Sequence, residues 1–246
     1  MKENKYDDNI FFQKYSQMSR SQQGLAGAGE WETLRKLLPD FKDKRVLDLG
    51  CGYGWHCIYA MEHGASSVVG VDISHKMLEV AKEKTHFPQV EYKCCAMEDV
   101  EFPGESFDVI LSSLAFHYVA DYEILVKKIY RILKSGGKLV FTVEHPVFTA
   151  YGTQDWYYNE KGEILHFPVD NYYYEGKRTA MFLEEKVTKY HRTLTTYLNT
   201  LLSNGFIINH IVEPQPPEYM MDIPGMQDEM RRPMMLIVSA NKKVDR

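Results

Sequence analysis

Three glycines at alternating positions form the first candidate site in this chain. Gly50, Gly52 and Gly54 follow a short apolar strand predicted over residues 45–49, and a helical pattern begins directly after them. Glycines let a backbone approach a ligand closely, and a helix N-terminus presents unpaired N–H groups. A strand, a glycine turn and a helix in this order are typical of a nucleotide-binding segment.

Acidic residues near this turn indicate which nucleotide it would hold. The dinucleotide fingerprint G-x-G-x-x-G requires a third glycine where the chain has Trp55. Asp48 lies inside the strand, where a carboxylate suits a ligand with an ammonium group better than one with a pyrophosphate. Asp72 ends the next apolar strand, predicted over 67–72, where a carboxylate can accept both hydroxyls of a ribose. The alternative is a plain βαβ unit with a surface aspartate.

The segment Val-Leu-Asp-Leu-Gly-Cys-Gly-Tyr-Gly, residues 46–54, resembles motif I of the class I S-adenosylmethionine-dependent methyltransferases, with the type 11 small-molecule group as the nearest pattern. The resemblance implies S-adenosylmethionine as cofactor and S-adenosylhomocysteine as product. It implies cofactor contacts by Asp48, Gly50, Cys51 and Gly52 in this segment. It also implies contacts by Asp72 and Ile73 at the end of the second strand.

Residues 95–103, after the third strand, resemble the adenine-contact segment of the same family. The resemblance implies that the Met97 N–H donates to the adenine ring. Ala96 is a departure, because the family usually has an acid there. The exocyclic amine of adenine therefore loses its usual partner, unless Glu98 or a backbone carbonyl accepts from it.

Two more cofactor contacts follow from resemblance. Tyr15-x-x-Met18-x-Arg20 is similar to an element that precedes many small-molecule methyltransferase domains and folds over the cofactor. Tyr15 is then expected near the amino acid part and Arg20 near its carboxylate. The alternative for Arg20 is an ordinary exposed helix position. At the end of the fourth strand, the backbone at Ser112 or Ser113 is expected to face the methionine end.

Two histidines are the candidate catalytic residues. Methyl transfer from a sulfonium needs a nucleophile about 3 Å from the carbon and in line with the bond that breaks. A base is needed only for hydroxyl or protonated amine acceptors. His117 follows the fourth strand and His145 the fifth, and either imidazole can take a proton near neutral pH. The alternative is that both only shape the site or cap elements. Tyr190, His191 and Arg192 are further candidates for the border of the pocket.

Alternating strand and helix patterns predict the frame that positions these residues. Strands are predicted over 45–49, 67–72, 89–94, 107–113 and 137–144, and helices over 54–63, 75–85 and 121–134. Ser135-Gly136-Gly137 is a helix stop of the expected chemistry. Alternation of this kind predicts a parallel sheet with helices on both faces and right-handed crossovers.

The C-terminal part departs from this alternation. A helix is predicted over 190–202 and strands over 206–212 and 234–240, and no helix is predicted between these two strands. Two such strands suggest an antiparallel pair. With the family resemblance, the expected fold is a doubly wound, mostly parallel α/β sheet of seven strands with an antiparallel last strand. Residues 1–246 are expected to form one domain, with a helical cap over 1–40.

An aromatic insertion is expected over residues 145–189, with a hairpin around Glu160-Lys161-Gly162-Glu163. Its aromatic residues are Phe148, Tyr151, Trp156, Tyr157, Tyr158, Phe167, Tyr172, Tyr173, Tyr174 and Phe182. Ligands of open α/β sheets bind at the carboxyl ends of the strands, where this insertion begins. It is expected to be a lid or a wall of the substrate pocket. The alternatives are a satellite core and a contact in a homodimer.

Composition limits the class of partner. The net charge is −5, the isoelectric point is near 6.0, and no run of lysine and arginine occurs, so nucleic acid is not expected as a substrate. No apolar stretch reaches the ~18 residues of a membrane span, and the polar first residues do not resemble a signal peptide. A cytoplasmic location is the expectation. Cys51, Cys57, Cys94 and Cys95 lack metal-site spacing, so no metal is expected.

The sequence therefore predicts methyl transfer from S-adenosylmethionine to a small molecule. The fourth strand lacks the Asn/Asp-Pro-Pro-aromatic signature of enzymes that methylate planar amino groups of bases or glutamine. Oxygen, nitrogen and carbon acceptors all stay open. One alternative is a non-catalytic S-adenosylmethionine-binding regulator or partner subunit. The other is an NAD(P)-dependent oxidoreductase, against which Trp55 and Asp48 argue.

Overall fold

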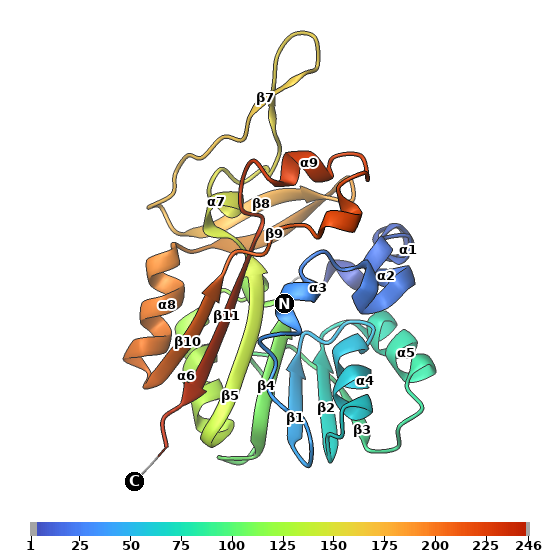
Figure 1. Ribbon diagram of the computed structural model, residues 1–246, viewed down its shortest axis with the longest axis vertical. Helices are drawn as coiled ribbons and strands as arrows, with labels where there is room; N and C mark the ends of the chain where they lie inside the picture. The colour runs from blue at the N-terminus through green and yellow to red at the C-terminus, as the bar shows by residue number, and fades with distance from the viewer. Residues whose placement is uncertain (1–3, 245–246) are drawn as a thin grey trace.

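The computed structural model describes residues 4–244, and seven strands of this part form one sheet in the order β10-β11-β5-β4-β1-β2-β3 (Figure 1). The strands are β1 Arg45–Leu49, β2 Ser67–Asp72, β3 Val90–Cys94, β4 Phe107–Ser113, β5 Leu133–Glu144, β10 Phe206–Val212 and β11 Met235–Lys242. Only β11 runs against its neighbours, β5 and β10. The predicted fold class is confirmed. Residues 1–3 of the predicted cap and 245–246 of the predicted domain lie outside the described residues.

Helices cover both faces of the sheet, as the strand–helix alternation predicted. They are α3 Trp31–Leu34, α4 Trp55–Glu62, α5 His75–Lys84, α6 Tyr122–Ile132 and α8 Leu194–Ser203. One core packs α6 and α8 against the sheet, and the other core packs α3, α4 and α5. In β1, Leu47 and Leu49 face the first core while Val46 faces the second. Burial on both faces is typical of parallel strands.

The predicted helix stop after α6 is wrong. The helix ends at Ile132, and Ser135-Gly136-Gly137 lies inside β5. The ladder between β4 and β5 shifts register here, because Phe107 pairs with Leu133 while Val109 pairs with Lys138. The glycine pair therefore makes a bulge within the strand, a position that glycine also favours.

The C-terminal helix begins later than its apolar spacing predicts. Tyr190 and His191 belong to β9 Glu185–His191, which pairs with β8 Gly176–Phe182. The helix α8 starts after Thr193, whose side chain accepts from the Thr196 N–H and so caps the helix. The long connection between β10 and β11 also contains two short elements where no helix is predicted, η4 Glu218–Met220 and α9 Met226–Glu229.

Short helices of the N-terminal segment lie over the carboxyl end of the sheet (Figure 1). They are η1 Lys5–Asp7, α1 Asn9–Ser16, α2 Ser19–Gln23 and η2 Gly24–Gly27. The Asp7 carboxylate accepts from Ser74 Oγ at 2.6 Å and from the Lys76 N–H at 3.1 Å. These bonds add a second cap to α5 and fix the N-terminal segment beside the end of β2.

The predicted insertion folds as α7 Pro146–Ala150 and two hairpins. The hairpin predicted around residues 160–163 is present as β6 Tyr157–Tyr158 and β7 Ile164–His166, and it projects away from the sheet (Figure 1). The second hairpin, β8–β9, lies closer to the sheet. Within residues 4–244, no helix is long and apolar enough to cross a membrane.

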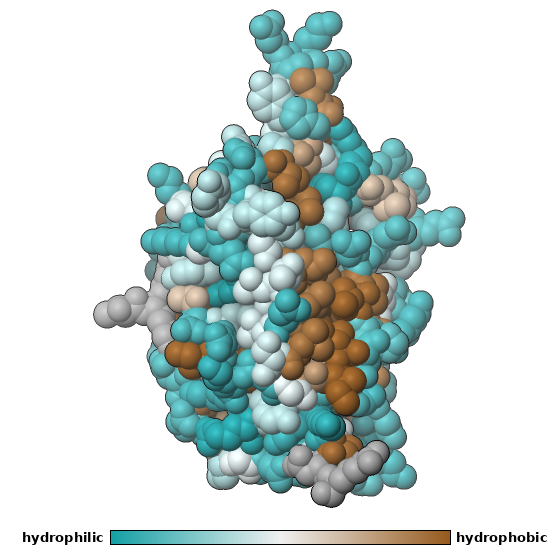
Figure 2. All heavy atoms as spheres, turned by 90° about the vertical axis from the view of Figure 1, so that its left-hand side faces the viewer, coloured by the Kyte–Doolittle hydropathy of each residue, from teal (hydrophilic) through white to brown (hydrophobic). Residues whose placement is uncertain are grey.

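An apolar surface marks the side of the molecule formed by α8 and β10 (Figure 2). Leu202, Ile207 and Ile211 are among its exposed side chains. The strand β10 is also an edge of the sheet, because β11 is its one partner among the strands that the structure describes.

Candidate active site

A cavity of about 580 Å³ lies at the carboxyl ends of the parallel strands. Residues from the ends of four strands line it, among them Asp72, Ser113 and Glu144, together with the loops after β1 and β3. This is the place where open α/β sheets bind ligands, and the volume is typical of a small-molecule site. We call its two parts the glycine-loop side and the hairpin side. The glycine-loop side is defined by Tyr15, Arg20, Gly50, Gly52, Asp72 and Met97, and the hairpin side by Tyr6, His117, Glu144, Phe182, Thr188 and Met235.

The glycine loop has a conformation that other residues would not adopt easily. Gly50 and Gly52 have φ angles of +78° and +52°. A Cβ atom on Gly50 would lie 2.4 Å from the Cβ of Ala115, whereas one on Gly52 would meet no heavy atom within 4 Å. Gly50 is therefore needed for close packing, and the backbone at Gly52 borders open space in the cavity.

Asp72 joins this loop to the end of β2. One carboxylate oxygen accepts from the Gly52 N–H and the other from the Ser74 N–H, both at 2.9 Å. Burial raises the pKa of this carboxyl above its ordinary value. A carboxylate has about four lone-pair positions, so two remain for further donors. Two vicinal hydroxyls of a ribose fit this capacity. Ile73 lines the cavity beside it.

The segment after β3 is held so that its backbone can reach a ligand. Lys128 of α6 donates to the carbonyls of Glu98 and Val100 at 2.6 and 3.0 Å. The Met97 N–H has no hydrogen-bond acceptor among the described residues, and both Met97 and Ala96 line the cavity. An adenine ring edge is an acceptor of the kind that this N–H lacks.

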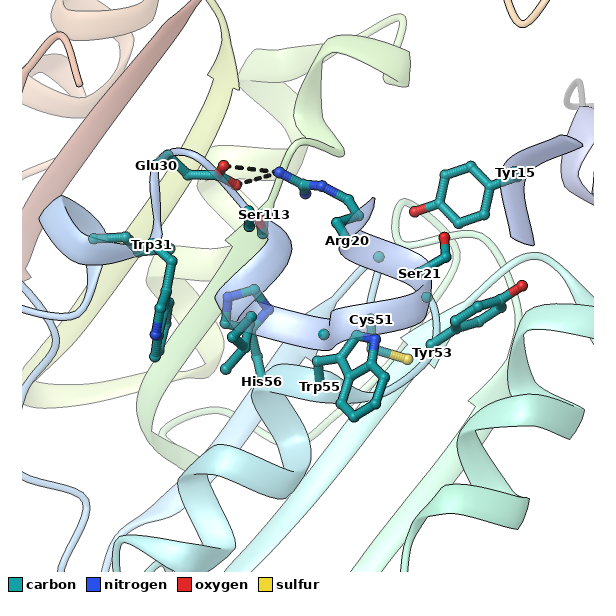
Figure 3. A pocket seen from close by; sticks show the side chains of 16 residues that line it. Tyr15, Arg20, Ser21, Glu30, Trp31, Cys51, Tyr53, Trp55, His56 and Ser113 are labelled. Atoms are coloured by element: carbon teal, nitrogen blue, oxygen red, sulfur yellow. Dashed lines mark hydrogen bonds and ion pairs between the residues drawn. The ribbon is translucent and has the colours of Figure 1, made fainter. Parts of the chain in front are cut away.

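Arg20 lies at the cavity but is already paired. Its Nη2 donates to both carboxylate oxygens of Glu30, at 2.6 and 2.8 Å, and Glu30 is only 2% exposed (Figure 3). The guanidinium has further N–H donors, so it can bind a second carboxylate without leaving Glu30. Tyr15 lies near the same wall. Glu30 has no local motif, and the sequence interpretation missed it.

A side pocket of about 70 Å³ opens next to the glycine loop and is lined by Arg20, Cys51, Trp55 and His56 (Figure 3). Trp55 Nε1 and His56 Nε2 are buried and have no hydrogen-bond partner within residues 4–244. Burial lowers the pKa of His56 to about 4, so its ring is neutral at pH 7. Unpartnered polar atoms beside a cation fit the charged amino acid end of S-adenosylmethionine. The sequence interpretation assigned no role to either residue.

Two predicted cofactor contacts lie away from the main cavity. Asp48 is 1% exposed and faces α4, where its Oδ2 accepts from Cys57 Sγ at 3.5 Å. It does not line the cavity, because side chains alternate along β1 and Asp48 shares the face of Val46. Burial raises the pKa of its carboxyl to about 7. Cys51 lines only the side pocket.

The structure separates the two candidate catalytic histidines. His117 lines the cavity, and its Nδ1 accepts from the Glu144 N–H at 3.4 Å. Burial lowers the pKa of His117 to about 4, so the ring is neutral at pH 7 with its proton on Nε2. His145 lies outside the cavity lining. It caps α7 by accepting from the Val147 N–H, and its Nε2 lies 2.9 Å from Glu213.

The hairpin side contains a buried ion pair that the sequence interpretation missed. Lys189 Nζ lies 2.5 Å from Glu144 Oε1 and 2.8 Å from Gln154 Oε1, and Gln154 Nε2 donates to Glu144 Oε2 at 2.6 Å. The Glu144 and Lys189 side chains are 11% and 3% exposed. Glu144 ends a parallel strand, a position that would have marked it as a candidate. Lys189 has no such signal.

Most aromatic residues of the insertion do not reach the cavity. Phe182 is the one of the ten that lines it, alongside Val187 and Thr188 of the same hairpin. Phe148, Trp156 and Phe167 instead surround the Arg232 guanidinium, at 4.6 to 5.0 Å from the ring centres. Of the three residues proposed for the border at 190–192, Tyr190 alone lines the cavity.

Comparisons with known proteins agree with this geometry. A family model described as a methyltransferase domain matches residues 47–141. A crystal structure of a Listeria monocytogenes protein, assigned to the S-adenosylmethionine-dependent methyltransferases, is 57% identical with a TM-score of 0.86, covering 89% of this chain and 99% of that one. An S-adenosylmethionine-dependent methyltransferase from Mesorhizobium loti is 41% identical with a TM-score of 0.82, covering 89% and 100%.

A ubiquinone biosynthesis O-methyltransferase of Coxiella burnetii is 35% identical over 112 residues, which are 45% of this chain and 47% of that enzyme. This chain therefore matches only about half of the length of that enzyme. The two structural relatives match over nearly their whole length. The protein therefore belongs to the class I S-adenosylmethionine-dependent methyltransferases, and S-adenosylmethionine is its cofactor.

Proposed function

We propose that this methyltransferase acts on a small molecule bound at the hairpin side of the cavity, and that the methyl group moves by direct in-line displacement. The observation that carries the proposal is the continuity of the cavity. One space extends from Gly50, Gly52 and Asp72 to His117 and Phe182, so a cofactor and an acceptor can lie end to end. A volume of about 580 Å³ suits small ligands rather than a polymer.

The cofactor would lie along the glycine-loop side. Asp72 would accept the ribose hydroxyls, the Met97 N–H would donate to adenine, and Arg20 would meet the carboxylate of the amino acid end. The bound sulfonium supplies an activated methyl group. The protein's own task is then to position the acceptor and to exclude water. Tyr15, Ile73, Glu98 and Ser113 would be further contacts, which their positions in the lining of the cavity support.

His117 would donate a hydrogen bond to the acceptor rather than remove its proton. Its Nδ1 already accepts from the Glu144 N–H, so the proton lies on Nε2. This differs from the base that the sequence suggests for His117. We assign no role in the reaction to His145, since it caps α7 outside the cavity lining.

The β8–β9 hairpin would form the acceptor wall of the predicted lid. Phe182, Val187 and Thr188 support this, since all three line the cavity. The β6–β7 hairpin contributes no residue to the lining of the cavity within residues 4–244.

Fractionation of a methyl-transfer reaction tests the class of acceptor. The enzyme would be incubated with methyl-labelled S-adenosylmethionine and a whole-cell extract, which is then separated into small molecules, protein and nucleic acid. We expect label in the small-molecule fraction; label confined to protein or nucleic acid would refute the proposal. A chiral methyl group should be transferred with inversion of configuration, and retention would exclude a single in-line step.

The apolar surface of α8 and β10 would join two copies of the chain. The strand β10 leaves one row of backbone groups unpaired, and Ile207 and Ile211 are exposed beside it. Sedimentation velocity of the protein and of its Ile207→Lys variant tests this arrangement. A dimer that the variant abolishes is the expected result, whereas a monomer at all concentrations would contradict it.

A further inference from the structure

Cationic side chains outnumber carboxylates around the hairpin side of the cavity. Lys5 and Lys177 line it directly, and Lys189 lies behind Glu144. Arg192 lies behind another part of the wall. It is 5% exposed and donates to the carbonyls of Val119 and Ala120, two residues that line the cavity.

The charge of Arg192 is not cancelled nearby. No carboxylate lies within ion-pair distance of its guanidinium among residues 4–244. Its partners are the backbone carbonyls of Val119, Ala120 and Tyr190. The rings of Tyr122, Tyr190 and Tyr197 also surround it, with their centres at 5.4 to 6.0 Å. Carbonyl dipoles and ring faces stabilise a cation without changing the net charge.

Three carboxylates oppose these four cations, and one of them, Glu175, accepts from the Thr193 N–H beside Arg192. Glu144 is paired with Lys189, and Glu185 lies 3.5 Å from Lys5 at the surface. The ammonium of Lys177 has no carboxylate within ion-pair distance in the part of the chain that the structure describes. The wall facing an acceptor therefore carries a net positive charge, and a bound sulfonium adds to it.

The protonation state of His117 agrees with this net positive charge. Burial is the main cause that lowers its pKa to about 4, and Lys189 and Arg192 act in the same direction while Glu144 opposes them. A neutral imidazole with its proton on Nε2 is a donor toward the cavity. The lining thus offers a hydrogen-bond donor and positive charge on a surface that is otherwise apolar at Phe182 and Met235.

On the basis of the function proposed above, we propose that the acceptor is a small organic anion whose ionised oxygen, a carboxylate or an acidic hydroxyl, is attached to an apolar body. An oxygen lone pair forms the bond to the methyl carbon while the carbon–sulfur bond breaks and its electron pair stays on sulfur. The anion and the sulfonium become a neutral ester or ether and a neutral thioether. An acidic hydroxyl releases its proton to solvent when it binds, so no protein base is required.

Three isosteric probes test the charge preference. Benzoate, benzamide and benzamidine have nearly the same shape and differ in charge, and each would be titrated into enzyme saturated with S-adenosylhomocysteine while the melting temperature is followed. We expect benzoate to stabilise the complex and benzamidine to have no effect. Stronger stabilisation by benzamidine, or no response to benzoate, would overturn the proposal. Failure of S-adenosylhomocysteine itself to stabilise the protein would instead count against the cofactor placement.

A lysine variant and a coloured phenol extend the test. Lys177→Met should weaken benzoate binding roughly two- to five-fold, the usual size of one exposed charge interaction. Lys161→Met, in the turn of the β6–β7 hairpin, is the matched control and should leave it unchanged. The phenol 4-nitrophenol, whose ionised form is yellow, tests whether the site also prefers an ionised hydroxyl. Its pKa should fall in the complex, and a rise would contradict a net positive wall.

Discussion

Removal of the Lys189 ammonium should be among the most costly single changes in this protein. The Lys189→Met variant keeps the length of the side chain but leaves Glu144 ionised and 11% exposed, with Gln154 as its one remaining side-chain donor among the described residues. Breaking a buried ion pair on one side costs about 3–5 kcal/mol of unfolding free energy, because the remaining charge has lost its compensation. Restoring neutrality with Glu144→Gln in the same chain should recover most of that loss.

Urea unfolding, analysed as a two-state transition, gives the required free energies. Lys186→Met is the matched control, because Lys186 is exposed on the same strand, and it should change stability by less than about 0.5 kcal/mol. A loss below about 1 kcal/mol for Lys189→Met, or a double variant less stable than the single one, would refute the reasoning.

The pH dependence supplies an independent check. In the native protein His117, Lys189 and Gln154 overcome the burial of Glu144 and lower the pKa of its carboxyl, so its stabilising contribution is lost as pH falls. Without the ammonium, burial should raise that pKa above its unfolded value. Protonation of Glu144 would then remove the uncompensated charge from the variant. The difference in unfolding free energy between the variant and the native protein should therefore be smaller at pH 5 than at pH 7. A deficit that is the same at both pH values would contradict a charge-based cause.

Three further predictions concern the glycine-loop side. Asp72→Ala should weaken S-adenosylhomocysteine binding by about 3 kcal/mol, or roughly 100-fold by calorimetry, through the loss of charged hydrogen bonds to ribose; unchanged affinity would refute the assignment. Gly50→Ala should destabilise the fold by more than about 1 kcal/mol in thermal unfolding, because its Cβ would lie 2.4 Å from that of Ala115 at a positive φ; a stable variant with normal binding would contradict this. The pKa of Asp48, raised to about 7 by burial, means that the folded state holds a proton that the unfolded chain releases near pH 3.9, so stability should fall as pH rises toward 7. Asp48→Asn should reduce the dependence of unfolding free energy on pH, measured by urea titrations at several pH values. An unaltered dependence would show that Asp48 does not cause it.

The parts of the site that the sequence predicted are those with local patterns. The glycine loop, Asp72 and Met97 lie at or just after the carboxyl ends of β1, β2 and β3, so their place at one edge of the sheet follows from topology. Asp48 belongs to the same motif, yet it faces α4. A motif gives the order of residues along a strand, but the face that each side chain takes depends on which neighbours are buried beside it.

The hairpin side was predicted less well because it is assembled from distant segments. Glu144 and Lys189 meet through strands that are 45 residues apart, and their pairing leaves no periodic signal. The apolar spacing after residue 190 indicates a helix, but pairing with β8 makes Tyr190 and His191 part of a strand. Tertiary pairing therefore overrode local preference where the acceptor is proposed to bind.

The N-terminal segment contacts both ends of the cavity. It places Tyr15 and Arg20 on the glycine-loop side, while the Tyr6 hydroxyl lies 3.0 Å from that of Tyr118 on the other side. Its α1 helix is joined to the turn of the β8–β9 hairpin by Lys14, which donates to the Leu183 carbonyl and pairs with Glu184 at 2.6 Å.

This one segment borders both sides of the cavity, so it would cover a cofactor and an acceptor at the same time, and the cofactor could exchange only while the acceptor site is empty. The kinetic consequence is an obligatory order, in which the cofactor enters before the acceptor and leaves after the product. Product inhibition by S-adenosylhomocysteine should then be competitive with S-adenosylmethionine and noncompetitive with the acceptor. Added salt, which screens the exposed Lys14 pair, should speed cofactor exchange more than it weakens cofactor affinity.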